Sequence, residues 1–137
     1  MNSLSEAQFD VILDHYRNPR NYGELKEYSV RVKDSNPLCG DVIEVFLKIN
    51  SDGVIEKASF RGHGCAISQA SASMLIESIH GKKLDDVKAL DKQNIFDMLG
   101  IDVGPVRVKC ALLSLKAVKA AVYTFLGKEM DSKEFEE

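Results

Sequence analysis

The chain has 137 residues, which is the size of one ordinary domain and is long enough to bury a core without disulfide staples. Its composition, 45% hydrophobic and 28% charged, is typical of a globular chain and excludes a disordered or collagen-like protein. The formal net charge of -3 argues against a nucleic-acid partner, because nucleic-acid-binding domains carry a basic surplus or stripe. We therefore expect a single domain over residues 1–137.

The sequence shows no targeting or membrane segment. No stretch approaches the roughly 18 uninterrupted apolar residues that a membrane span requires. Residues 1–6 have neither the basic region nor the apolar region of a secretory signal. We therefore expect a cytoplasmic protein without a membrane partner, in which the thiols stay reduced.

The first predicted element is an amphipathic helix. Apolar residues recur at helical spacing from Phe9 to Tyr16. The helix should end near Asn18, because Pro19 disfavours helical geometry in the residue before it.

Three strands are predicted next. Alternation indicates a strand over 28–33 that Ser35-Asn36-Pro37 should break, and residues 41–49 are rich in β-branched and aromatic side chains. A turn over 50–53 leads to a third strand over 54–60, so the three should form an antiparallel meander.

The remainder of the chain reads as helical. The predicted helical segments are Ala66–His80, Leu84–Leu99, and a last helix from about Val108 or Cys110 to Leu126, preceded by the connection Gly104-Pro105. The order of elements predicts an α+β fold, a small three-stranded antiparallel sheet covered by helices.

The cysteines carry the chemical signal. Cys39, Cys65 and Cys110 each lie at a junction between predicted elements, and an odd number in a reducing compartment indicates metal ligation or sulfur chemistry. A helix N-terminus stabilises a thiolate, and we place Cys65 and Cys110 at such ends, with Lys109 adding a positive charge. Buried cysteines that act as small hydrophobic residues remain the alternative.

Four neighbours of the cysteines complete the candidate set. Gly40 and Gly64 allow backbone amides to approach the sulfur atoms. Asp41, two residues after Cys39, is a candidate fourth ligand, although such a carboxylate is usually a solvated turn residue. His63 is a further candidate ligand, whereas His15 and His80 are interpreted as structural.

These residues together resemble the IscU/NifU/SufU family of iron–sulfur cluster assembly proteins. The resemblance covers about Phe9 to Phe125 and rests on several motifs in order. The motifs are Asp14-His15-Tyr16-Arg17-Asn18-Pro19-Arg20-Asn21, Cys39-Gly40-Asp41, Gly62-His63-Gly64-Cys65-Ala66-Ile67-Ser68, Ala70-Ser71-Ala72-Ser73 and Lys109-Cys110.

The resemblance implies a scaffold that builds a [2Fe–2S] cluster and passes it to apo iron–sulfur acceptor proteins. By position, Cys39, Cys65 and Cys110 would be ligands and Asp41 the non-cysteine ligand. A cysteine desulfurase would supply sulfur as a persulfide, with Cys110 or Cys39 as acceptor. The same donors would accept Zn²⁺, and the resemblance also allows a homodimer that shares the cluster.

Two departures from the family pattern bear on the function. IscU-type scaffolds carry a histidine directly before the third cysteine, whereas this chain has Lys109 there, as SufU-like members do. The SufU branch also has an insertion between the second and third cysteines, and the 44 residues between Cys65 and Cys110 are too few to contain it. Residues 104–109 lack the first Leu and first Pro of the Leu-Pro-Pro-Val-Lys motif, which leaves binding of an Hsp70-type chaperone open.

Two other functions remain open at this point. One is an enzyme, a zinc-dependent sulfurtransferase resembling SufU, in which Cys39 leaves the metal to accept persulfide sulfur. The other is a structural zinc domain, which predicts that chelation unfolds the protein. The scaffold, which does no turnover chemistry, is the interpretation we carry forward.

Overall fold

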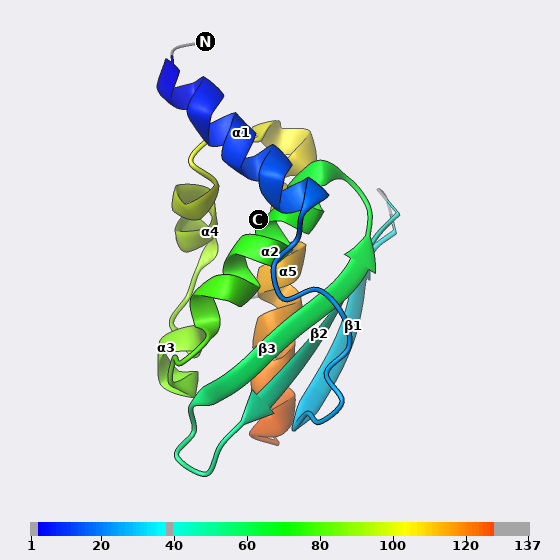
Figure 1. Cartoon of the computed structure of the whole chain (residues 1–137), viewed down its shortest axis with the longest axis vertical. Helices are drawn as coiled ribbons and strands as arrows, with labels where there is room; N and C mark the ends of the chain where they lie inside the picture. Colours follow the sequence, from blue (N-terminus) through cyan, green and yellow to red (C-terminus); the bar gives the residue numbers. More distant parts are fainter. Residues whose placement is uncertain (1–2, 38–39, 128–137) are drawn as a thin grey trace.

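A computed structural model describes residues 3–37 and 40–127 of the chain. Three strands form one antiparallel sheet in the order β1-β2-β3 (Figure 1). The strands are β1 Val30–Asn36, β2 Asp41–Ile49 and β3 Ile55–His63. Adjacent strands are connected directly along the chain, so the predicted meander is confirmed.

The helices gather on one face of this sheet. They are α1 Ser3–Arg17, α2 Ala66–Ile79, α3 Leu84–Lys88, α4 Lys92–Leu99 and α5 Gly104–Phe125. Helix α5 packs against β1 and β2, and α2 packs against β3. Figure 1 shows α5 behind the sheet and α1 crossing over α2. The α+β prediction is therefore confirmed, and no helix of the described residues is long and apolar enough to cross a membrane.

The two faces of the sheet are buried to different extents. On the helix side, Ile43, Val45 and Leu47 of β2 are fully buried in the main core, as the alternation predicts. On the other side Phe46 is also fully buried, because the guanidinium carbons of Arg31 and Arg61 lie 5.9 and 5.5 Å from its ring centroid. These cation–π contacts, together with the edge-on ring of Tyr28, therefore cover Phe46 without a second layer of helices.

The strands are longer than their apolar patterns predict. β1 includes Ser35 and Asn36, because Asn36 still pairs with Asp41 across the ladder. β3 continues through Gly62, whose missing side chain makes room for β2, since a Cβ atom there would lie 2.1 Å from the carbonyl oxygen of Val42. The prediction that β1 ends before Ser35 and that β3 ends at Phe60 was therefore wrong, because residue types that favour turns continue both strands.

Two helix boundaries also differ from the prediction. Residues 84–99 form two helices, since Asp91 begins α4 with a capping box in which its side chain accepts from the backbone N–H of Asn94. The last helix begins at Gly104 rather than at Val108 or Cys110, because Pro105 in a first helical turn is compatible with helix geometry.

Candidate metal centre

Three potential ligands meet where one end of the sheet adjoins two helices. Asp41 begins β2, Cys65 precedes α2, and Cys110 lies in α5. One donor atom from each lies within 4.8 Å of the others. Residues separated by 24 and 45 positions in sequence are thus brought to one point, which is close enough for a single metal ion to contact all three.

Asp41 connects two parts of this cluster. Its Oδ1 accepts a hydrogen bond of 2.8 Å from the backbone N–H of Cys65, the N-cap residue of α2. Its Oδ2 lies 3.8 Å from the Sγ of Cys65. The carboxylate therefore satisfies a backbone donor at the start of α2 and keeps its second oxygen beside the sulfur.

Gly64 is required by this arrangement. Its φ is +144°, a conformation that residues with a side chain rarely adopt. A Cβ atom there would lie 2.0 Å from Oδ1 of Asp41. The glycine therefore lets the β3–α2 turn pass directly over the carboxylate.

Cys110 lies deeper in its helix than the sequence predicts. Because α5 begins at Gly104, Cys110 is the seventh helical residue rather than a residue at the start. The field of a helix N-terminus falls off within the first turn, so the expected stabilisation of a Cys110 thiolate by that dipole was wrong. Cys65, at the N-cap of α2, does have that environment.

The structure describes three other predicted site residues, Gly40, Lys109 and His63, and all three are exposed. Cys39 lies outside the described residues. Gly40 is exposed with a φ of +70°. Lys109 and His63 are exposed, and within the described part of the chain neither hydrogen-bonds to the three donors. His63 pairs with Val42, so its side chain lies on the sheet face opposite Asp41.

The two remaining histidines have structural contacts. His15 is buried, its Nδ1 lies 2.8 Å from Oγ of Ser73, and burial holds its pKa below the usual value. Nε2 of His80 accepts a hydrogen bond from the backbone N–H of Ala58, and its Nδ1 lies 2.9 Å from the carbonyl oxygen of Ile76. The structural interpretation of both fits these contacts.

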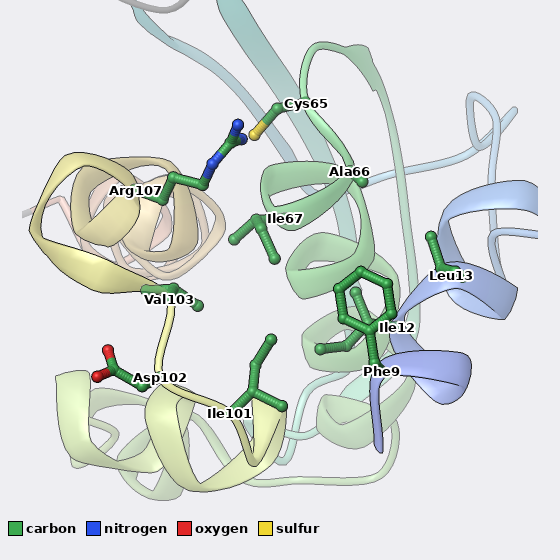
Figure 2. Close-up of a pocket in the computed structure, with 10 residues that line it drawn as sticks. All are labelled: Phe9, Ile12, Leu13, Cys65, Ala66, Ile67, Ile101, Asp102, Val103 and Arg107. Atoms are coloured by element: carbon green, nitrogen blue, oxygen red, sulfur yellow. The ribbon is translucent and has the colours of Figure 1, made fainter. Parts of the chain in front are cut away.

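An open groove of about 480 Å³ leads to the cluster from the side of Cys65. Figure 2 shows the guanidinium of Arg107 close to the Cys65 sulfur at one end, with apolar side chains such as Phe9 and Ile101 towards the other. Among the three donor residues, Cys65 is half-buried whereas Asp41 and Cys110 are buried. A molecule in this groove would therefore meet Cys65 first.

The donor set suits a thiophilic metal. Two thiolates and a carboxylate are ligands of tetrahedral Zn²⁺, and thiolates are the usual ligands of iron–sulfur clusters. As metal ligands both thiols would lose their protons, and the positive charge of a bound cation would offset the three negative groups that result.

Two residues near the cluster were not singled out by the sequence. Asn36 is buried at the end of β1 and its Nδ2 lies 3.8 Å from Sγ of Cys110. Arg107 lines the groove. The position of Asn36 beside the cluster could be predicted only from the β1–β2 register. The position of Arg107, three residues before Cys110, could be predicted only from the correct start of α5.

The chain is similar in sequence to a known protein family and to curated proteins. The family model "NifU-like N terminal domain" matches residues 7–132. The iron–sulfur cluster assembly scaffold protein IscU of Haemophilus influenzae is 36% identical over 131 residues, which covers 90% of this chain and 98% of that protein. The zinc-dependent sulfurtransferase SufU of Bacillus subtilis is 43% identical over 139 residues, covering 88% and 92%.

The chain is also similar to solved structures. A putative iron–sulfur cluster assembly scaffold protein for the SUF system from Fervidobacterium islandicum superposes with a TM-score of 0.73 at 26% identity, over 82% of this chain and 94% of that one. A hypothetical protein solved at 2.3 Å superposes with a TM-score of 0.75 at 30% identity, over 86% and 98%.

Proposed function

The chain belongs to the NifU-like N terminal domain family, and from this premise we propose that it acts as one domain on which a [2Fe–2S] cluster is assembled and then transferred to apo-proteins. The observation that carries the proposal is the meeting of Asp41, Cys65 and Cys110, whose donor atoms lie within 4.8 Å of one another. The similarity to IscU scaffolds supports it.

In this proposal the cluster is cargo, and the chain's residues hold it for a limited time. Cys39, Cys65 and Cys110 supply thiolates, and Asp41 supplies a harder oxygen ligand that binds iron less firmly than a fourth thiolate would. The Asp41 carboxylate also accepts the hydrogen bond from the Cys65 N–H. When the bond between Asp41 and iron breaks, this hydrogen bond keeps the carboxylate in place. The vacated coordination position on iron is then open to a thiol of the acceptor protein.

The partners follow from the substrates. Sulfur is to come from a cysteine desulfurase, with Cys110 or Cys39 as the persulfide acceptor, and the cluster leaves to apo iron–sulfur proteins. Cytoplasmic conditions would keep the thiols reduced for this work. A homodimer sharing the cluster belongs to the same proposal, and Hsp70-type chaperone binding does not, because residues 104–109 match that motif only in part.

Anaerobic reconstitution tests the function. Protein purified without oxygen is mixed with ferrous iron, cysteine, a cysteine desulfurase and dithiothreitol, the reductant that helps convert persulfide sulfur to sulfide. Bound iron, sulfide and the visible spectrum are then measured. We expect equal amounts of iron and sulfide with a [2Fe–2S] spectrum, and loss of both in Cys110→Ser. Ser114→Ala, a buried substitution in the same helix, should retain the cluster. A wild-type chain that takes up no sulfide contradicts the proposal.

Removing the carboxylate tests the release step. Asp41→Ala should change the rate of cluster transfer to an apo-ferredoxin about tenfold or more, because the replaceable ligand is gone. Asp34→Ala is a matched control, since Asp34 lies on the same side of the sheet but pairs with Lys116 of α5. Equal transfer rates for wild type and Asp41→Ala would remove Asp41 from the mechanism.

A zinc-dependent sulfurtransferase is the second candidate. Lys109 before Cys110 and the 43% identity to SufU favour it. In that function Zn²⁺ is held by the same donors and Cys39 accepts sulfur. Stoichiometric zinc without sulfide after anaerobic purification, together with stimulation of desulfurase turnover, would favour this candidate over the scaffold.

A further inference from the structure

The buried amide of Asn36 is the contact at the cluster that the proposed function does not use. Asn36 is the last residue of β1 and is 9% exposed. Its Nδ2 donates to Sγ of Cys110 across 3.8 Å, a distance typical of a weak N–H···S hydrogen bond. Asn36 and Cys110 are 74 positions apart in sequence.

The sheet register explains why Asn36 lies there. Asn36 pairs with Asp41, and directly opposed residues on antiparallel strands project to the same face. Two positions back along β1, Asp34 reaches Lys116 of α5, so this face is the one covered by α5. Asn36 and Asp41 therefore approach α5 together, one beside the sulfur of Cys110 and the other beside Cys65.

We propose that Asn36 is a positioning residue for the metal centre, which acts through a hydrogen bond from its side-chain amide to the Cys110 sulfur. This inference rests on the proposed function, because it concerns Cys110 as a ligand. The amide directs the sulfur towards Asp41 and Cys65. It also withdraws electron density from a metal-bound thiolate without competing for the metal, since the amide nitrogen is a donor only.

The support of the centre comes from two elements, the N-cap of α2 and the end of β1. The backbone N–H of Cys65 holds Asp41, and the side chain of Asn36 holds Cys110. Neither contact requires a metal to be present, so two of the donors are placed before metal arrives. Loss of such a supporting contact typically lowers metal affinity by about 10- to 100-fold.

Two substitutions separate the hydrogen bond from the packing. Asn36→Leu keeps approximately the shape and removes the donor, whereas Asn36→Asp keeps the size but replaces the donor nitrogen with an acceptor oxygen and adds an ionisable carboxyl group. The matched control is Ser71→Ala, which removes the hydrogen bond from a fully buried hydroxyl to the carbonyl oxygen of Ala111, next to Cys110, without touching sulfur.

The experiment measures metal binding without turnover. Each purified full-length protein is titrated with Zn²⁺ against a competing chelator, and its Co²⁺ form is recorded for the thiolate-to-cobalt charge-transfer band. We expect both Asn36 variants to bind Zn²⁺ about 10- to 100-fold more weakly. The charge-transfer band should move to longer wavelength, because a metal-bound thiolate that accepts no hydrogen bond transfers an electron to cobalt more easily. Ser71→Ala should lower the urea midpoint but leave the affinity and the band unchanged.

The outcomes distinguish this inference from the function on which it rests. Variants that fold and match wild type in both affinity and band position overturn the role of Asn36 alone. A weaker affinity with an unmoved band also overturns it, since that result describes a packing defect. If Asn36→Leu does not fold, Asn36→Asp decides. A wild-type chain with no thiolate–cobalt band overturns the metal centre together with this inference.

Discussion

At the scale of single residues, the metal centre depends on the absence of a side chain at Gly64. Gly64 lies against Asp41 at a distance that leaves no room for a side chain, and its φ of +144° is one that a side chain would resist. The carboxylate and the turn therefore fit together only with glycine at position 64. This requirement is separate from metal ligation and can be tested separately.

Gly64→Ala should damage both folding and metal binding. Left-handed strain of about 1–2 kcal/mol and overpacking of about 1–3 kcal/mol against Asp41 together predict a loss of about 3 kcal/mol in the free energy of unfolding. Zn²⁺ affinity should fall as well, since the carboxylate is displaced. Urea denaturation and chelator competition measure the two effects.

Gly53→Ala is the matched control for that substitution. Gly53 also has a positive φ, +74°, but an added Cβ would meet nothing within 4 Å. It should therefore lose only the ~1–2 kcal/mol of backbone strain and keep its metal affinity. Similar losses for the two variants would show that the contact with Asp41 is not decisive.

At the scale of elements, α1 is joined to α2 by a polar contact inside an otherwise apolar interface. His15 of α1 meets Ser73 of α2, and Ser73 Oγ also accepts from the backbone N–H of Arg20 in the segment that follows α1. Burial lowers the pKa of His15, and the charge of Arg20 lowers it further, whereas Glu77 and Asp14 oppose the shift. The folded state therefore favours neutral imidazole.

The contact predicts how stability varies with pH. Because the unfolded chain binds the His15 proton more tightly than the fold does, stability is full above the usual pKa of 6.5 and is lost as pH falls below it towards the lowered pKa. Urea midpoints of the apo-protein between pH 8 and pH 5 should show this loss. One proton contributes at most about 1.4 kcal/mol per pH unit.

Substitution identifies the group responsible. His15→Gln should reduce the dependence of stability on pH below 6.5. An unchanged pH profile in His15→Gln would mean that the loss comes from other groups, and the α1–α2 contact would not be its source.

At the scale of the whole molecule, the core extends far beyond the metal centre, although Cys110 is buried in it and Cys65 packs against it. The core extends from Ile12 of α1 through the sheet to Val122 of α5, whereas the donor atoms meet at one end of the sheet. On the opposite sheet face, Glu44 is buried and bonds to both Arg31 and Arg61, which raises the pKa of Arg61. Folding therefore has its own sources of stability.

Because the core extends so far beyond the donor atoms, we expect metal removal to leave the fold intact. Chelator-treated protein should keep its far-ultraviolet circular dichroism. Zn²⁺ at about 100 times its Kd should add about 2.7 kcal/mol and raise Tm by roughly 10 °C. Cys110→Ser should show little of that rise. Unfolding on chelation alone would instead identify a structural zinc domain.

The sequence by itself determined the order of elements, the α+β class and the residue types of the centre. These follow from local patterns: β2 has the predicted bounds because its β-branched run is continuous, and Cys65 lies at a helix start because a glycine turn precedes a helical segment. The family resemblance was also readable, since its motifs are short and local.

Only the tertiary structure decided which residues surround the sulfur atoms. Cys110 lies inside α5 and Asn36 inside β1 because helix packing and ladder pairing continue through Gly104-Pro105 and Ser35-Asn36, which taken locally favour breaks. His63 projects away from the centre for the same reason, since extension of β3 fixes its face. Contacts between segments that are distant in sequence leave no pattern in the local sequence. They form, and stabilise the protein, only when the chain is folded.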